Sequence, residues 1–296
     1  MRYDCHIHTH KSSKFGDCKY GDFKNFDRDG YLADLKKADI DGSAVFSLSP
    51  IHYPEATVEE RMQAALDICN GSDRLFPFFW IDPTEEDALS QVDLAVKKGF
   101  VAFKMIPSTY NVGCQKSMDV IEKIASYGKS VLFHSGICWD GMNSAANHKP
   151  ANYEALIEIP KLKFCLAHVS WPWYDECIAV YGKFNNAYFT RPQTSCEMFI
   201  DVTPGTPEVY REEVFRHLLC SGYELRYNLM FGTDCNTAEY NHSWSSKWQK
   251  IDNELYDKFI PEDVEDFKEH VYGKNFLRFI GLSDEQPVKK IPLVGQ

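Results

Sequence analysis

Two histidines near the start of the chain have a spacing that suits a metal site. His6 and His8 lie two residues apart in the short apolar run Tyr3–His8. Side chains alternate between the two faces of a β-strand, so both imidazoles would point to the same side. Two neutral imidazoles on one face can share a metal ion. The alternative is a strand whose histidines pack or hydrogen-bond inside the fold, and the pair alone does not decide between them.

Further along the chain, four more polar residues each stand at the end of an apolar run. They are Lys104, His134, His168 and Asp234. Together with the first pair, five of these six side chains are histidine or carboxylate, the ligand types of nitrogen–oxygen sites for divalent metals. Burying so many polar groups without partners would cost several kcal/mol. A common site therefore explains them better than separate roles in packing.

The elements that must position these residues follow from the alternation of β-type runs with amphipathic segments. Eight such units match the length of a (β/α)8 barrel, an α/β fold with a parallel sheet. In this barrel, catalytic groups come from the carboxyl ends of the strands, where the six polar residues would meet. The expected strands are Tyr3–His8, Ser43–Ser49, Leu75–Asp82, Phe100–Ile106, Ser130–His134, Leu162–His168, Met198–Val202 and Leu229–Asp234.

Apolar residues at three- and four-residue spacing predict the helices between the strands. Thr57 and Glu60 match a capping box at one helix start. After the last strand, Ser245–Leu282 predicts two additional helices. We expect one domain over residues 1–296, with a tail over residues 282–296. The expected helices of the repeating units are Tyr31–Lys37, Val58–Cys69, Glu85–Lys98, Ser117–Ser126, Tyr153–Glu158 and Val209–Cys220.

Composition limits the classes of partner. Hydrophobic residues make up 44% of the chain, enough for a sizeable core. The 32 basic and 43 acidic residues give a net charge of −11, which argues against nucleic acid and anionic membrane surfaces as partners. No stretch approaches the roughly 18–20 apolar residues of a membrane span, and no signal segment opens the chain. These features predict a cytoplasmic protein that acts on a small molecule.

The ten cysteines contain no Cys-x-x-Cys pair. Cys5, Cys165 and Cys220 lie within apolar runs, so we expect buried thiols in a reducing cytoplasm. The missing pair spacing also argues against zinc held by cysteines.

The polar set and its surroundings resemble a known family. His6-x-His8, His134, His168 and Asp234 resemble the amidohydrolase superfamily, and more closely its amidohydrolase-related branch, which includes aminocarboxymuconate-semialdehyde decarboxylase-like proteins. The sequence after His168 departs from the branch, which commonly has Gly-Gly there. The local patterns that carry the resemblance are VLFHSG (131–136), KFCLAHVSWPW (163–173), LMFGTDCNT (229–237) and YGKNFLRFIGL (272–282).

The resemblance implies one zinc ion held by His6, His8, His134 and Asp234, and a homodimer is typical of the branch. Zinc lowers the pKa of water to roughly 7. Asp234 would orient that water and take its proton, while His168 would polarise the substrate. The ligand types alone do not fix the metal, so another divalent ion stays open.

Lys104 has two interpretations. In binuclear members of the superfamily, a carboxylated lysine bridges two metals, and here His134 and His168 would hold the second ion. Alternatively, Lys104 lies near the barrel mouth and pairs with Asp82 or with a substrate carboxylate. Both interpretations stay open.

Several residues in the expected mouth loops could contact substrate. Arg191 could bind a carboxylate with two hydrogen bonds, although a surface position is the alternative. Tyr110 follows an expected strand and is another candidate contact. Tryptophans could line a pocket for a flat, cyclic or aromatic substrate, or simply pack the loops. Four of them follow expected strands: Trp139, Trp171, Trp173 and Trp244.

Two chemistries fit these residues. The first is hydrolysis of a small molecule, cyclic or carboxylate-bearing, through a metal-activated water. The second is non-oxidative decarboxylation of an aromatic or unsaturated acid at the same site. A cationic anchor in the pocket, from Arg191 or Lys104, would favour the decarboxylase. The intact ligand set argues against a third possibility, a non-enzymatic binding protein on a barrel scaffold.

Overall fold

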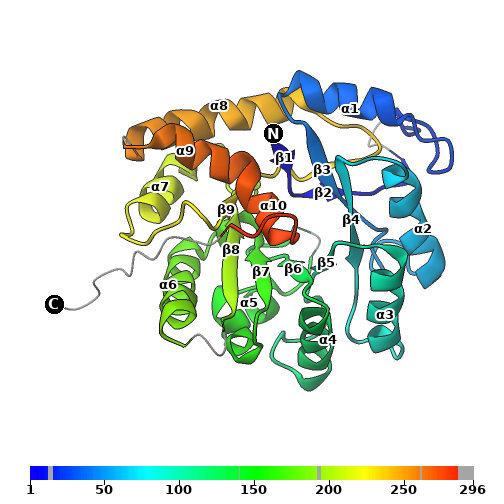
Figure 1. Ribbon diagram of the computed structural model, residues 1–296, viewed down its shortest axis with the longest axis horizontal. Helices are drawn as coiled ribbons and strands as arrows, with labels where there is room; N and C mark the ends of the chain where they lie inside the picture. Colours follow the sequence, from blue (N-terminus) through cyan, green and yellow to red (C-terminus); the bar gives the residue numbers. More distant parts are fainter. Residues whose placement is uncertain (13–15, 140, 192–194, 261, 286–296) are drawn as a thin grey trace.

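The computed structural model describes residues 1–12, 16–139, 141–191, 195–260 and 262–285. A parallel sheet forms its centre, and helices surround it (Figure 1). This arrangement confirms the (β/α)8 fold class. The strands of the sheet are, in order, β1 (Tyr3–Asp4), β3 (Gly42–Phe46), β4 (Leu75–Trp80), β5 (Ala102–Met105), β6 (Ser130–Phe133), β7 (Lys163–Leu166), β8 (Glu197–Asp201) and β9 (Leu229–Met230).

A second, two-stranded pair joins the first and last parts of the barrel. In it, β2 (Ile7–His8) runs parallel to β10 (Cys235–Asn236). Between these strands, the backbone N–H of Asp234 donates to the carbonyl of His6 at 3.1 Å. The predicted first strand is thus split into β1 and β2, and the predicted last strand is shortened to β9 and followed by β10. The pairing of β2 with β10 brings His6, His8 and Asp234 to one place.

The helices follow the predicted order, with several differences, among them the short helix Ser144–Asn147, which was not predicted. The segment Tyr153–Glu158 belongs to a 3-10 helix, Pro150–Glu158, and Tyr174–Thr190 forms a helix that was not predicted. The part after the last strand forms three α-helices with a π-helical turn, His270–Lys274, instead of two helices. The helices are α1 (Arg28–Lys37), α2 (Val58–Cys69), α3 (Ala88–Lys98), α4 (Gln115–Ser126), α5 (Ser144–Asn147), α6 (Tyr174–Thr190), α7 (Glu208–Leu219), α8 (His242–Phe259), α9 (Val264–Glu269) and α10 (Asn275–Phe279).

Two helices show where local sequence does and does not decide the structure. Helix α2 has the predicted bounds and the predicted capping box, in which Thr57 Oγ1 accepts from the Glu60 N–H and Glu60 Oε2 accepts from the Thr57 N–H. Helix α6 contains Gly182 and Asn185, which are weak helix formers. It is stabilised by burial of its apolar face, including Phe184, so tertiary packing overrides the local preference.

The core has one layer outside the sheet and one inside the barrel. Inside the barrel, Phe46, Phe78 and Phe199 are fully buried. Helix α10 covers the amino-terminal end of this inner layer, because Phe276 stacks on Phe78 at 6.3 Å and Phe279 meets Phe199 at 5.3 Å between ring centroids. The additional C-terminal helices therefore complete the core at the end of the barrel opposite the predicted site.

The C-terminal pattern Asn-x-x-Arg has a structural role here. Asn275 Nδ2 donates to the carbonyl of Leu229 at 2.7 Å, at the start of β9. Arg278 Nη1 donates to both carboxylate oxygens of Glu197 at 2.6 and 2.7 Å, at the start of β8. Both members of this ion pair are buried. The pattern thus fastens α10 to the beginnings of the last two strands of the main sheet.

Arg278→Met is expected to lower the free energy of unfolding by about 3–5 kcal/mol, because it leaves the buried Glu197 carboxylate without its cation. Urea denaturation followed by circular dichroism measures the change. The double variant Arg278→Met with Glu197→Gln is the control, and it should recover part of the loss. A loss below about 1 kcal/mol, as for an exposed ion pair, would contradict this role.

The cysteines are free thiols, and two of the three predicted buried ones are buried. All ten cysteines lie in the described residues, and no disulfide links them. Cys5 and Cys165 are buried as expected, but Cys220 is exposed, so that prediction was wrong. Cys220 follows the last residue of α7, so its side chain does not belong to the buried face of that helix.

Within the described residues, no helix combines the length and apolarity that a membrane crossing needs. Most of the expected tail, residues 286–296, lies outside the described residues.

Candidate metal centre and active site

Three of the predicted metal ligands meet at the carboxyl end of the barrel. One ligand atom from each of His6, His8 and Asp234 lies within 4.8 Å of the others. Asp234 Oδ1 is 3.0 Å from His8 Nε2 and 3.5 Å from His6 Nε2. The pairing of β2 with β10 creates this approach, since it places the two histidines beside the residues that follow β9.

Asp201 orients the ring of His6. The Nδ1 atom of His6 lies 3.0 Å from Asp201 Oδ2, and both side chains are buried. Burial and the nearby charge of Lys104 lower the pKa of His6 to about 3 against the opposing effect of Asp201, so the imidazole is neutral. A carboxylate can only accept, so Nδ1 carries the proton and Nε2 keeps its lone pair on the side of Asp234. A carboxylate behind a histidine in this way is typical of metal-binding histidines.

Asp201 was not among the predicted site residues. Burial alone would raise the pKa of this carboxyl group, but the hydrogen bond with His6 and the neighbouring imidazoles lower it to about 2. Its Oδ1 also accepts the backbone N–H groups of His168 at 2.8 Å and Thr203 at 3.1 Å. The available indication was a charged residue within the apolar run 198–202, since a buried carboxylate needs partners.

His168 lies in a left-handed turn directly after β7. The φ angles of His168, Val169 and Ser170 are 61°, 48° and 55°. A residue other than glycine in this region costs of order 1–3 kcal/mol and persists only where its surroundings hold it. Here Asp201 accepts the His168 N–H, as described above. The Nδ1 atom of His168 is buried beside Gly205 and has no hydrogen-bond partner among the described residues.

The imidazoles form a continuous row across the site. The ring centroids are 5.2 Å apart for His8 and His6, 5.1 Å for His6 and His168, 5.2 Å for His168 and His134, and 4.9 Å for His134 and His148. His168 therefore stands between His6 and His134. Within the described part of the chain, His134 does not join the group of His6, His8 and Asp234. The structure brings together three of the four expected ligands, and the role of His134 stays a prediction.

Lys104 is buried beside His6. Its Nζ lies 3.2 Å from His6 Nε2 and 5.1 Å from the centre of the Phe46 ring. Burial lowers the pKa of Lys104 to about 8, although Asp201 and Asp234 oppose this effect. No ion pair joins Lys104 to Asp82 within the described residues, and Asp82 Oδ1 instead accepts from Thr84. Lys104 thus lies next to the expected metal ligands.

A cavity of about 520 Å³ lies beside Asp234. Asp234 lines it together with Asn236, Tyr240, His242 and Trp244. The position of Trp244 near the barrel mouth is as predicted. The lining is mostly polar, with aromatic rings from Tyr240 and Trp244, so a polar molecule in this cavity would have access to Asp234.

A row of three aromatic rings is formed by two loop tryptophans and a tyrosine of α7. Trp139 stacks on Trp171 at 6.4 Å with an angle of 15° between the rings, and Trp171 stacks on Tyr210 at 6.1 Å. Trp139 is 77% exposed, so the row has an accessible flat face. The fourth predicted tryptophan, Trp173, has the ammonium group of Lys149 over its ring at 5.5 Å.

The structure does not bring the other two predicted contacts to the metal ligands. Arg191 is exposed and follows the last residue of α6, before the start of β8. Asp201 lies at the other end of that strand, because α6 returns the chain to the amino-terminal side of the sheet. Tyr110 is buried in the hydrophobic layer outside the sheet. Its substrate role, like that of Arg191, has no support from this placement.

The barrel with His6, His8 and Asp234 at its carboxyl end can be compared with known proteins. The family model for amidohydrolases matches residues 3–282 of this chain. This chain belongs to the amidohydrolase family. A search of curated proteins found no match to this amidohydrolase.

Solved structures share the fold of this amidohydrolase. An amidohydrolase from Burkholderia multivorans with bound HEPES has a TM-score of 0.64 and 10% identity, covering 96% of this chain and 100% of the other. An amidohydrolase from the same organism with bound zinc, in another crystal form, has a TM-score of 0.61 and 11% identity, covering 96% of this chain and 100% of the other. The 2,6-dihydroxybenzoate decarboxylase from Rhizobium has a TM-score of 0.61 and 12% identity over 95% and 98%. At these identities the likeness concerns the fold.

Proposed function

We propose that this amidohydrolase is a metal-dependent hydrolase of a small molecule, cyclic or carboxylate-bearing. The observation that carries the proposal is the meeting of His6, His8 and Asp234, with Asp201 fixing the tautomer of His6. This arrangement lies beside a cavity large enough for a small molecule. A cytoplasmic location and a homodimer, both predicted from the sequence, belong to the same proposal.

The donor set fits a zinc ion. It offers two imidazole nitrogens and one carboxylate oxygen, and the neutral His6 has its Nε2 lone pair available. His134, one ring beyond His168, is the proposed fourth ligand. The zinc in the Burkholderia multivorans structure supports this choice of metal. A bound divalent ion would supply a Lewis acid and lower the pKa of water at the site.

The protein side chains then have distinct roles. Asp234 is ionised, because the hydrogen bond with His8 and the nearby imidazoles outweigh burial and hold its pKa well below the usual range. Its carboxylate would orient the attacking water and accept a proton from it. His168, between His6 and His134, would stabilise charge on the substrate oxygen.

Decarboxylation of an aromatic acid is the second candidate. The exposed ring row of Trp139, Trp171 and Tyr210 favours a flat substrate, and a structural relative is a 2,6-dihydroxybenzoate decarboxylase. The exposed position of Arg191 leaves Lys104 as the cation nearest the site among the two predicted anchors. Neither of these two anchors lines the cavity beside Asp234, so hydrolysis is the first candidate, and carboxylate capture by Lys104 would reverse the order.

Lys104 also decides between one metal ion and two. A carboxylated Lys104 would bridge two ions, whereas an ammonium group beside His6 fits one. Metal analysis by mass spectrometry together with anomalous scattering would give the number of ions and the state of Lys104. We expect one zinc ion per chain.

A paired substrate screen tests the reaction. Metal-free protein is reconstituted with zinc and offered lactones and cyclic imides, whose ring opening releases a proton that serves as the readout. In parallel it is offered hydroxybenzoates, with carbon dioxide release as the readout. Proton release that requires zinc supports the hydrolase, and carbon dioxide release would establish the alternative. If zinc neither binds nor supports any turnover, both enzymatic proposals fail.

His168→Ala is expected to keep the full zinc content and to lower kcat by about 10²–10⁴-fold, because it removes a group that acts on the substrate. Zinc content and steady-state kinetics on the substrate found in the screen measure the two effects. Loss of half the bound metal would instead indicate two ions, with His168 as a ligand of the second.

A further inference from the structure

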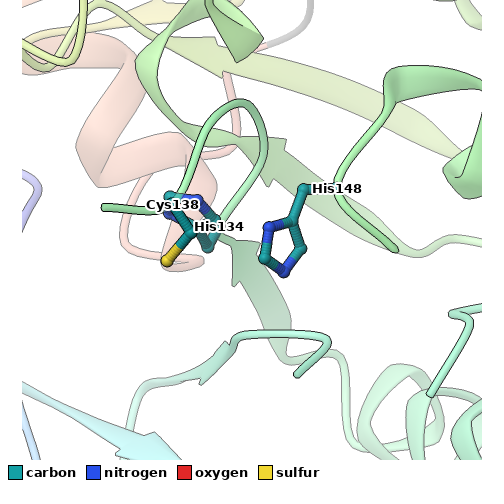
Figure 2. Close-up of side chains that lie close together, drawn as sticks. All are labelled: His134, Cys138 and His148. Atoms are coloured by element: carbon teal, nitrogen blue, oxygen red, sulfur yellow. The ribbon is translucent and has the colours of Figure 1, made fainter. Parts of the chain in front are cut away.

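We propose that His134, Cys138 and His148 form a second metal site, which takes a thiolate-binding divalent cation such as Zn²⁺. One ligand atom from each of the three side chains lies within 4.8 Å of the others. Figure 2 shows the three side chains gathered at one loop after β6. None of the three belongs to the group formed by His6, His8 and Asp234.

The backbone of the loop places His148 beside His134. Ser135 Oγ and the N–H of Gly136 both donate to the carbonyl of His148 at 3.0 Å. Gly136 has a φ of 98°, and a Cβ there would lie 2.5 Å from the carbonyl oxygen of Trp171. The loop thus needs glycine at this position, and its closure brings two imidazoles together at 4.9 Å between centroids.

Ser144 holds Cys138 in place relative to His148. Its hydroxyl accepts the backbone N–H of Cys138 at 2.8 Å, and its carbonyl accepts the backbone N–H of His148 at 2.8 Å. Ser144 itself is buried. The backbones of Cys138 and His148 are therefore both held by Ser144, so little ordering of the loop would be needed when a cation binds.

The tautomer of His148 suits a ligand. Its Nε2 lies 2.8 Å from the carbonyl oxygen of Pro107. A carbonyl only accepts, so Nε2 carries the proton and Nδ1 carries the lone pair. In Figure 2, the ring nitrogen nearer the backbone, which is Nδ1, faces His134. A backbone carbonyl behind the other ring nitrogen is a common feature of histidines that bind metals.

The donor types indicate which cation would bind. One thiolate and two imidazoles favour zinc and similar transition metals over magnesium and calcium, which prefer oxygen ligands. The absence of Cys-x-x-Cys pairs argued against cysteine-bound zinc, but this site needs a single cysteine. Three protein ligands leave one position of a tetrahedral ion for water or another small ligand.

Occupancy of this second site has a consequence for catalysis, which rests on the proposed function. His134 is the proposed fourth ligand of the first site and a ligand of the second. A cation held with Cys138 and His148 would compete for His134. We therefore expect zinc beyond the first equivalent to inhibit turnover.

Cobalt binding to the metal-free protein tests the site without an activity assay, because a thiolate bound to Co²⁺ gives a charge-transfer absorption in the near ultraviolet. We expect this absorption in the unmodified protein and in Asp234→Asn, which impairs only the first site. Cys138→Ser should abolish it and remove one equivalent of bound cobalt. The exposed cysteine variant Cys220→Ser is the control and should retain the absorption.

The outcomes are separable from those of the proposed function. If the unmodified protein gives no thiolate absorption, or if Cys138→Ser retains it, the second site does not exist. If Asp234→Asn also loses the absorption, the site is not separate from the first. Alkylation of the unmodified protein gives a check that needs no variant, since zinc should slow modification of Cys138 but not of Cys220. Equal rates with and without zinc would overturn the proposal.

Discussion

Asp234→Asn should lower kcat by about 10⁴-fold, the upper range for loss of a catalytic acid–base group, and should also reduce the zinc content. The substitution keeps the shape of the side chain but removes the charge that faces His6 and His8. The fold should survive, because residue 234 has a φ of 60° and asparagine tolerates this left-handed conformation.

Steady-state kinetics and metal analysis of the reconstituted variant measure both effects. Asp82→Asn is a matched control, because Asp82 also follows a strand of the barrel and its carboxylate accepts from Thr84, with no metal ligand beside it among the described residues. The control should keep its zinc and its kcat. If Asp234→Asn retained both as well, Asp234 would be neither a ligand nor the proton acceptor.

Asp201→Asn should weaken zinc binding by about 10–100-fold, although Asp201 is not itself an expected ligand. Asp201 accepts hydrogen bonds on both carboxylate oxygens, from His6 on one and from the His168 backbone on the other. An amide offers one oxygen and one NH₂ group, so one of these donors would face another donor. Either His6 changes its tautomer or the turn at His168 loses its support.

Zinc affinity of this variant is measured by competition with a chromophoric chelator, and circular dichroism establishes that the fold is kept. Both His6 and His168 depend on Asp201, so kcat should fall together with affinity. Unchanged zinc affinity in a folded variant would show that the Asp201 contact does not set the orientation of His6.

Much of the barrel could be predicted because its information is local. The alternation of apolar runs and amphipathic segments indicated the strands, and Val58–Cys69 carried its own capping box. His6 and His8 share one face of a strand, so their approach followed from strand geometry. Asp234 met them because the first and last strands of a closed barrel are neighbours.

The remaining features depend on contacts between distant residues. Asp201 gains its role from His6, which lies far away in the sequence, and no local pattern indicates that pairing. His134 lies beside Cys138 and His148 because the loop folds back on itself through Ser144. Arg191 follows an unpredicted helix, and the length of that helix carries it to the other end of the barrel.

The rings of Phe276 and Phe279 across the amino-terminal end of the barrel affect how molecules travel. With that end covered, a substrate would arrive through the mouth on the carboxyl side, and the product would depart by the same route. Substrate and product would then compete for the same entrance and the same site. Accumulated product should therefore act as a competitive inhibitor that raises the apparent KM and leaves kcat unchanged.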